Sequence, residues 1–196
     1  ATYLKMNNFD IIGVEKSSEI IKIFKKKKIP IKVVNSDMRS FKINKKFDVV
    51  IALFCVMNYL LTDIDLKKTF YTVNRHLKKG GLFIFDFWYT PAVLNIKPKK
   101  TIVNIKTDNF KLTRLALPKI LRNNLVNVKY KYKLLKGNKI SNFFENHKVR
   151  HFNLHELNKI SKDQNLNFQY ATKMLDSNIK PSKKTWKVCA IYRKSL

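Results

Sequence analysis

Glycine and proline are scarce in this chain of 196 residues, which contains four glycines and five prolines. Long flexible linkers and low-complexity segments are rich in these residues, so we exclude such segments and expect most of the chain to lie in helices and strands. Hydrophobic residues make up 45% of the sequence, which is enough for a sizeable core. The chain is therefore expected to fold as one body.

Cysteine is equally rare. Cys55 and Cys189 each lie in an apolar run, which is typical of small buried thiols and not of a disulfide or a metal site. No apolar stretch approaches the roughly 20 residues needed to span a bilayer, and the first residues do not resemble a signal peptide. We expect a cytoplasmic protein with no membrane partner.

Acidic residues are few: 13 against 41 lysines and arginines, for a formal net charge of +28. This charge alone points to nucleic acid or another anionic partner. However, only six of the basic residues are arginine, and the lysines are spread along the chain beside abundant asparagine and isoleucine, as in proteins from AT-rich genomes. Lysine on solvated faces is common, so a nucleic-acid partner stays open but is not favoured.

Strands and helices are expected to alternate through the first half of the chain. Helix-start signals stand at Ser17 and at Thr62 with Asp65, and Gly80-Gly81 is expected to end the second of these helices. Continuous apolar runs suit strands covered on both faces, and parallel neighbours need crossover connections. These patterns predict a parallel sheet in a three-layer α/β sandwich. The expected strands cover residues 10–15, 31–34, 47–54 and 82–87.

The second half alternates with a period of two from about residue 101 to residue 152, which indicates an antiparallel insertion with a hairpin turn at Lys136-Gly137-Asn138. Asn153 is expected to cap a helix, and two closing strands follow. We therefore expect a core formed by residues 1–98 and 153–196, with residues 99–152 inserted as a β lid. The expected lid strands cover residues 101–106, 110–117, 125–135 and 140–152.

Four segments resemble successive landmarks of the class I S-adenosylmethionine-dependent methyltransferases: residues 11–17, 35–39, 47–50 and 77–85. The inserted sheet is similar to the lid of small-molecule methyltransferases, including those acting on sugar amines and glycine-type amines. The resemblance implies a Rossmann-like sandwich with a mostly parallel sheet and S-adenosyl-L-methionine as cofactor. It also implies in-line methyl transfer to nitrogen or oxygen of a small-molecule acceptor.

One landmark of that family is missing, namely the glycine-rich turn after the first strand. If Glu15 ends the second strand, the spacing in dinucleotide sites puts those glycines about 20 residues earlier, before residue 1. The chain begins with alanine, and residues 2–6 resemble the tail of the helix that follows this turn. We therefore expect a truncated chain whose sheet lacks its first strand, which leaves open whether this chain binds cofactor.

Ligands of open α/β sheets sit beyond the carboxyl ends of the strands, so the cofactor is expected there. Glu15, beside Lys16, can accept hydrogen bonds from both ribose hydroxyls, or it is a solvated acid. Asp37 can accept from the adenine amino group beside the apolar surface of Met38, or it caps a turn next to a core methionine. By the resemblance, the methionine part is lined by Leu53, Phe54 and Cys55, which could equally be core residues.

The acceptor is expected beside Asn58, Tyr59, Asp86, Trp88 and Tyr89, which follow the third and fourth strands. Arg150 binds an anionic part of the substrate in one interpretation and pairs with Glu145 in the other. If the acceptor must lose a proton, His147 is the candidate catalytic base, since histidine titrates near neutrality; otherwise it is an exposed strand residue.

His147, His151 and His155 recur every four residues, a spacing that lines one face of a helix and could hold a metal ion. Because His147 lies in an expected strand and a helix is expected to begin only at Asn153, these side chains should not share a face. We expect no metal site.

Two other functions stay open beside small-molecule methyl transfer. The charge supports an RNA methyltransferase or a basic RNA-binding module, and the missing landmark supports a catalytically inactive methyltransferase-like subunit. The oligomeric state is not predicted.

Overall fold

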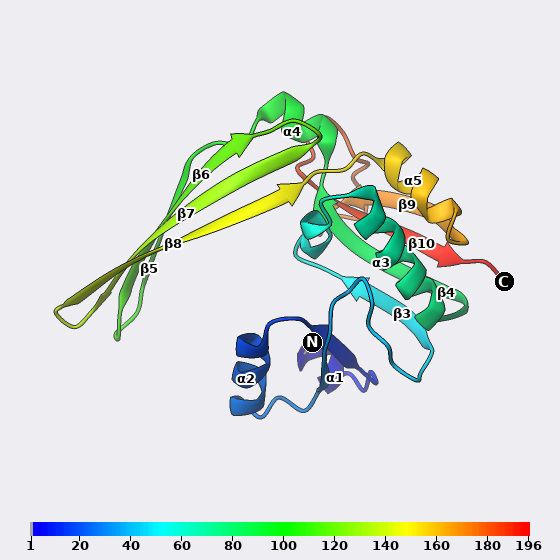
Figure 1. Cartoon of the computed structure of the whole chain (residues 1–196), viewed down its shortest axis with the longest axis horizontal. Helices are drawn as coiled ribbons and strands as arrows, with labels where there is room; N and C mark the ends of the chain where they lie inside the picture. The colour runs from blue at the N-terminus through cyan, green and yellow to red at the C-terminus, as the bar shows by residue number, and fades with distance from the viewer. Residues whose placement is uncertain (1) are drawn as a thin grey trace.

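The structure, a computed structural model, describes residues 2–196 and contains helices and strands in a mixed α/β arrangement (Figure 1). The helices are α1 (Thr2–Met6), α2 (Ser18–Lys26), the 3-10 helix η1 (Val56–Tyr59), α3 (Asp63–His76), α4 (Thr90–Ile96) and α5 (Leu154–Lys162). The core strands are β1 (Ile12–Glu15), β2 (Lys32–Asn35), β3 (Phe47–Ala52), β4 (Leu77–Trp88), β9 (Leu166–Lys173) and β10 (Lys187–Lys194). The lid strands are β5 (Thr101–Lys106), β6 (Lys111–Ile120), β7 (Leu125–Lys136) and β8 (Lys139–Arg150).

The expected helix starts are confirmed. The side chains of Ser17, Thr62 and Asn153 each accept a hydrogen bond from the backbone N–H three residues further on, which satisfies a donor that the helix itself leaves free. The end predicted for α3 at Gly80-Gly81 is wrong, because the helix stops at His76 and β4 begins at Leu77. The two glycines lie in an irregular stretch of that strand, where Gly80 has a positive φ of 71°.

The core strands form two sheets within residues 2–196, and not the single sheet predicted. β1 pairs with β2 in parallel, and a second sheet has the order β3-β4-β10-β9. Only β3 and β4 are parallel in this second sheet, because β10 runs antiparallel to β4 and to β9. With the β1-β2 pair included, two of the four pairings between core strands are parallel, so the prediction of a mostly parallel sheet holds for half of them. In the described part of the chain, β1 and β3 each have one hydrogen-bonded edge.

The expectation that β3 is covered on both faces is also wrong. Val49 is 44% exposed and Ile51 48% exposed, whereas Phe83 and Phe85 on the neighbouring strand β4 are fully buried. β3 is an edge strand in the described sheet, so its side chains contact fewer neighbours.

Aromatic side chains form the centre of the core under α3 and α5, which cover the same face of the β3-β4-β10-β9 sheet (Figure 1). The ring of Phe70 on α3 meets those of Phe83, Phe85 and Tyr192 edge to face, with centroids 5.5–5.8 Å apart. Edge-to-face contacts between buried rings add to the stability that area burial provides. This packing anchors β4, whose last residues reach the site described below.

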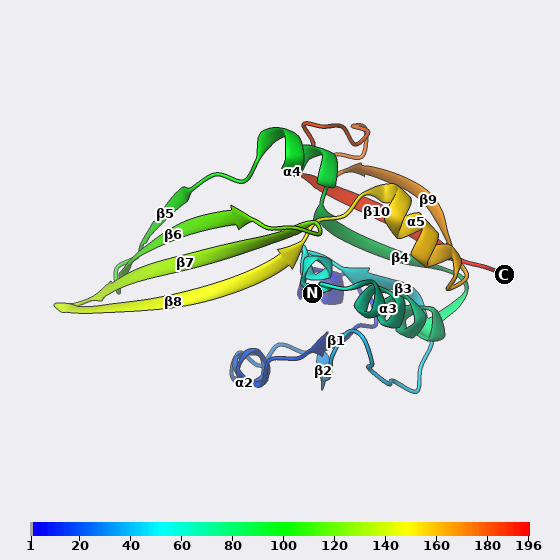
Figure 2. The same ribbon diagram turned by 45° about the horizontal axis from the view of Figure 1, so that its top comes forward.

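The lid is a four-stranded antiparallel sheet in the order β5-β6-β7-β8, and it extends away from the core as a long curved arm (Figures 1 and 2). Its strands and the Gly137 turn, where φ is 55°, confirm the alternating pattern of the sequence. The preceding helix α4 was not predicted, although Pro91 at its start is a helix-start signal. Among the described residues, no helix combines the length and apolar character needed to cross a bilayer.

Candidate active site

A cavity of ≈ 410 Å³ opens where the root of the lid meets the core. Its walls come from the segment after β3, from the end of β4, from the start of β10 and from lid strands β6, β7 and β8. Six residues proposed from the sequence line it: Phe54, Cys55, Asn58, Tyr59, Trp88 and His147. Residues from the first and second halves of the chain thus share one site.

A hydrogen-bond chain joins the core to the lid at this cavity. The hydroxyl of Tyr59 lies 2.8 Å from Nδ1 of His147, and Nε2 of His147 lies 3.2 Å from a carboxylate oxygen of Glu145. Tyr132 donates to the same oxygen at 2.9 Å. Hydrogen bonds from Tyr132 and His147 lower the pKa of Glu145, so this carboxylate is ionised at neutral pH.

The direction of these hydrogen bonds follows from the protonation of Tyr59. Burial, together with the nearby Tyr130 and Glu145, raises the pKa of this phenol, which therefore stays protonated and donates to Nδ1 of His147. A neutral His147 then carries its proton on Nε2, which points to Glu145. His147 is thus held from both sides, with Tyr59 as its neighbour in the cavity wall.

Phe54 and Cys55 form a strained turn that is separated from the end of β3 by one residue. Both residues have left-handed backbone conformations, with φ values of 65° and 61°, which non-glycine residues adopt only where the surroundings hold them. Asp86, which is 1% exposed, accepts hydrogen bonds from the backbone N–H of Cys55 at 2.9 Å and from its thiol at 3.2 Å. Asp86 therefore holds this turn through its hydrogen bonds to Cys55. Phe54, which lines the cavity, is 84% exposed.

The thiol of Cys55 is not a nucleophile in this setting. Burial, and secondarily the carboxylate of Asp86, raises its pKa to about 12, so the thiolate is rare at neutral pH.

Asn58 and Arg150 serve to join the lid to the core. The buried amide of Asn58 donates to the backbone carbonyl of Arg150 at 2.7 Å and accepts from the N–H of Trp88 at 3.3 Å. The guanidinium of Arg150 pairs with Asp63 at 2.7 Å and with Glu156, and not with Glu145 as one sequence interpretation held. Its side chain is 11% exposed, so it lies inside this junction.

Tyr89 stands beside the cavity and does not belong to its lining. It precedes α4, packs against Phe87, and donates its backbone N–H to the carbonyl of Trp186. The other half-buried neighbour, Leu53, follows β3 and is likewise absent from the lining.

The residues predicted to bind the nucleoside part lie together at the carboxyl ends of β1 and β2. Glu15 is paired in register with Asn35 and accepts the N–H of Ser17 at 2.8 Å through one oxygen, Oε1. Among the hydrogen bonds of the described residues, none involves its second oxygen. Glu15 therefore has a free acceptor for a hydroxyl group.

Asp37 is more fully engaged. It accepts hydrogen bonds from the guanidinium and the backbone N–H of Arg39 and pairs with Lys16 at 3.1 Å. The hydrogen bonds of Arg39 hold the pKa of this carboxyl well below its usual range. The turn that one sequence interpretation assigned to Asp37 is thus present, and Met38 packs beside it against the main core.

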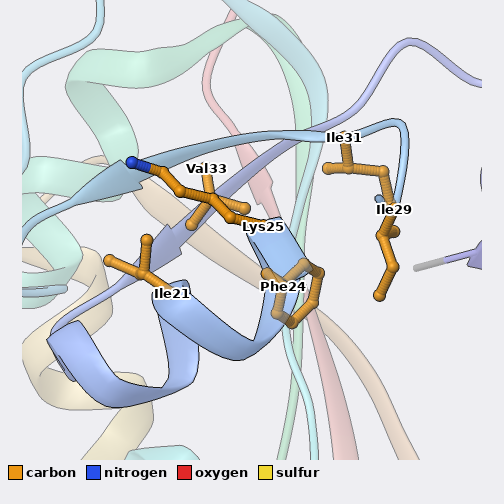
Figure 3. A pocket seen from close by; sticks show the side chains of 6 residues that line it. All are labelled: Ile21, Phe24, Lys25, Ile29, Ile31 and Val33. Carbon is orange, nitrogen blue, oxygen red and sulfur yellow. The ribbon is translucent and has the colours of Figure 1, made fainter. Parts of the chain in front are cut away.

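A smaller cavity of ≈ 110 Å³ lies between α2 and the β1-β2 sheet (Figure 3). Apart from Lys25 it is lined by apolar side chains: Ile21, Phe24, Ile29, Ile31 and Val33. With no polar group to orient a ligand except one lysine, we treat it as a packing gap of the core.

The three histidines spaced by four residues lie in different surroundings. His147 is in β8, His151 is buried with Nδ1 2.9 Å from the hydroxyl of Thr90, and His155 is exposed on α5.

Sequence reasoning missed several residues of the cavity: Arg114, Tyr130, Trp186 and Lys187, together with Glu145 as the partner of His147. Tyr130, Glu145 and His147 share one face of the lid, and the alternation of β7 and β8 could have indicated this. The contribution of Trp186 and Lys187 depends on the pairing of β10 with β4, which no local signal predicts.

Comparison with known proteins gives a consistent result. Residues 1–81 match a family described as a methyltransferase domain. The chain is 38% identical over 118 residues to an uncharacterized protein of Methanocaldococcus jannaschii, covering 59% of this chain and 42% of that protein. It is 28% identical over 82 residues to the dTDP-3-amino-3,4,6-trideoxy-alpha-D-glucopyranose N,N-dimethyltransferase of Streptomyces venezuelae, covering 42% and 35%. The chain thus spans less than half the length of these curated relatives.

The fold is shared with a crystal structure of an S-adenosylmethionine-dependent methyltransferase from Clostridium acetobutylicum, with a TM-score of 0.81. The identity is 23%, and the match covers 96% of this chain and 76% of that one.

Proposed function

We propose that the chain is a class I S-adenosylmethionine-dependent methyltransferase and that it transfers a methyl group from this cofactor to an amine of a small sugar-like molecule. The observation that carries the proposal is the cavity between core and lid, with the Tyr59 and His147 pair in its wall.

The cofactor, when bound, supplies a methyl group on a positively charged sulfur, and an acceptor lone pair displaces it in line. The protein's contribution to such a displacement is to hold the acceptor at attack distance in a site sheltered from water. The lid root and the end of β4 form such a shelter, since the lining combines Val128, Tyr130 and Val149 of the lid with Trp88 of β4.

On the cofactor side, Glu15 is proposed to bind the ribose of S-adenosylmethionine. Its free carboxylate oxygen suits a ribose hydroxyl, and the adjacent Lys16 pairs with Asp37, the residue before Met38. We assign Asp37 a supporting role, because its oxygens already accept hydrogen bonds from Arg39. The Phe54-Cys55 turn, held by Asp86, and Leu53 before it are proposed to face the methionine end.

On the acceptor side, the proton of an ammonium must leave before nitrogen can attack. We assign this step to a relay in which the acceptor donates to the oxygen of Tyr59 while the phenol proton moves to Nδ1 of His147. The ionised Glu145 then stabilises the imidazolium through Nε2. His147 is thus the base and Tyr59 the group that touches the acceptor.

The nature of the acceptor is supported by the walls of the cavity. The rings of Trp88 and Trp186 lie 5.4 Å apart at 61°, and such aromatic surfaces suit the apolar face of a sugar ring. The cavity volume of ≈ 410 Å³ is in the range of small-molecule sites. The Streptomyces venezuelae relative is itself named for a nucleotide-linked amino sugar.

The test is a methyl-transfer assay with labelled S-adenosylmethionine against a panel of amino sugars, their hydroxyl analogues and RNA. We expect transfer to amino sugars, and we expect His147→Gln to lower kcat about 10²-fold or more, since general base catalysis contributes on this order. His155→Gln, on the exposed face of α5, is the matched control and should leave kcat unchanged. Transfer to RNA alone would contradict the proposal.

A further inference from the structure

Arg114 of β6 is set apart from the paired arginines of the chain. Its side chain lines the cavity with the guanidinium stacked over Tyr130, Cζ lying 5.4 Å from the ring centroid. Its Nε is buried and makes no hydrogen bond with any described residue. Arg39 pairs with Asp37 and Asp65, and Arg150, whose Nε is also buried without a hydrogen bond, pairs through a terminal nitrogen with Asp63 and Glu156. Arg114 differs in that it has no carboxylate partner among the described residues.

An arginine in such a position is unusual on energetic grounds. The Arg114 side chain is half-buried, and its buried Nε donor has lost contact with water without gaining a partner, which costs free energy that a bound anion would offset. Contact with the ring of Tyr130 limits the conformations of the guanidinium, which reduces the entropy lost when the group binds an anion. Arg114 therefore has the properties of a preformed anion-binding group.

The other walls of the cavity add positive charge. Lys187, at the start of β10, is exposed and lies opposite Trp88 in the sheet register. The cavity lining contains no aspartate or glutamate. The nearby carboxylates are engaged elsewhere, since Asp86 accepts from Cys55 and Glu145 accepts from Tyr132 and His147.

We propose that the methyl acceptor carries a carboxylate or phosphate group, which Arg114 and Lys187 bind at the end of the cavity away from the transferred methyl group. This inference rests on the proposed function and names the substrate class of the same site. The guanidinium fork matches both anions in a bidentate manner, and Lys187 adds a second charge. A cation-lined cavity also favours the neutral form of an acceptor amine, which is the form that attacks.

The two tryptophans of the chain, Trp88 and Trp186, both line this cavity, so intrinsic fluorescence reports on its occupancy. We would titrate the protein with inorganic pyrophosphate and, separately, with succinate at constant ionic strength set by chloride. We expect a saturable fluorescence change with at least one of them. Tighter binding of pyrophosphate indicates a phosphate-bearing acceptor, and tighter binding of succinate indicates a carboxylate.

Matched variants separate this site from the general positive charge of the protein. Arg114→Gln is expected to weaken anion binding at least 10-fold, whereas Arg122→Gln, in the exposed loop after β6, should leave it within 2-fold. Lys187→Gln, at an exposed side chain, should weaken binding several-fold.

Equal effects of Arg114→Gln and Arg122→Gln, or no saturable signal, would overturn the inference. Because the titration contains neither cofactor nor acceptor, such a failure leaves the proposed methyl transfer to be judged by its own assay.

Discussion

The phenol of Tyr59 lies 2.8 Å from Nδ1 of His147 and thereby connects η1 in the core to β8 in the lid across 88 residues of sequence. If the two act as one proton relay, removing either should stop the same step. We expect Tyr59→Phe and His147→Gln each to lower kcat about 10²-fold or more, and the double variant to be no slower than the slower single one.

The measurement for this relay is the kcat of the three variants with a saturating amino-sugar acceptor. Tyr71→Phe, on the exposed face of α3, serves as the control and should behave as the wild type. Multiplicative losses in the double variant would show that the two side chains act independently.

Asp86 is predicted to stabilise the fold through the Phe54-Cys55 turn. Asp86→Ala leaves the part-buried N–H of Cys55 without its acceptor, which is expected to cost about 1–3 kcal/mol of unfolding free energy. Asp48→Ala removes only the exposed ion pair with Lys78, which solvent screens, and should leave stability nearly unchanged. Urea unfolding of both variants tests this difference; equal midpoints would show that the turn does not depend on Asp86.

His151 is predicted to make stability depend on pH. Burial, and secondarily the positive charge of Arg150, lowers its pKa from 6.5 to about 4, so the unfolded chain binds the extra proton first as the pH falls. Stability is therefore full above about pH 6.5 and declines between pH 6.5 and 4, by on the order of 2 kcal/mol.

His151→Gln should remove this dependence, whereas His155→Gln, on an exposed side chain, should retain it. The check is the unfolding free energy of the three proteins from pH 4 to pH 8. An unchanged slope in His151→Gln would assign the dependence to other groups.

Substitution by alanine is expected to lower the unfolding free energy strongly at Phe70 of α3 and only weakly at its neighbour Tyr71. Phe70 is fully buried among Phe83, Phe85 and Tyr192, so Phe70→Ala should cost about 3–5 kcal/mol through lost burial and the cavity left behind. Tyr71 is 52% exposed, and Tyr71→Ala should cost less than about 1 kcal/mol. Thermal unfolding of both variants distinguishes the two positions.

Local signals were sufficient for most elements of the fold. The caps at Ser17, Thr62 and Asn153 and the alternation in the lid depend on contacts a few residues apart, and the structure confirms them. The sheet order could not be predicted in the same way. Burial of β3 depends on which strands lie beside it, and an apolar run looks the same at an edge as at the centre.

Residues near the ends of strands could be placed at the cavity from the sequence, as for Phe54 and Trp88, which line it; the role of Glu15 stays a prediction. Other residues of the cavity were harder to predict from the sequence. Arg114 and Lys187 reach the cavity only because strands that are distant in the sequence pair with one another. Arg150 shows that a residue can also be assigned wrongly to a site from the sequence. An arginine near a site suggests an anionic ligand, yet the partners that neutralise it, Asp63 and Glu156, are visible only in three dimensions.

The central claim is that the carboxyl ends of β1 and β3 hold S-adenosylmethionine, and calorimetric titration of this cofactor into the protein tests it most directly. We predict micromolar binding that Glu15→Gln weakens at least 10-fold and that Glu19→Gln, an exposed acid on α2, leaves unchanged. Absence of binding, or equal affinity of the two variants, would contradict the account and favour a methyltransferase-like subunit without catalytic activity.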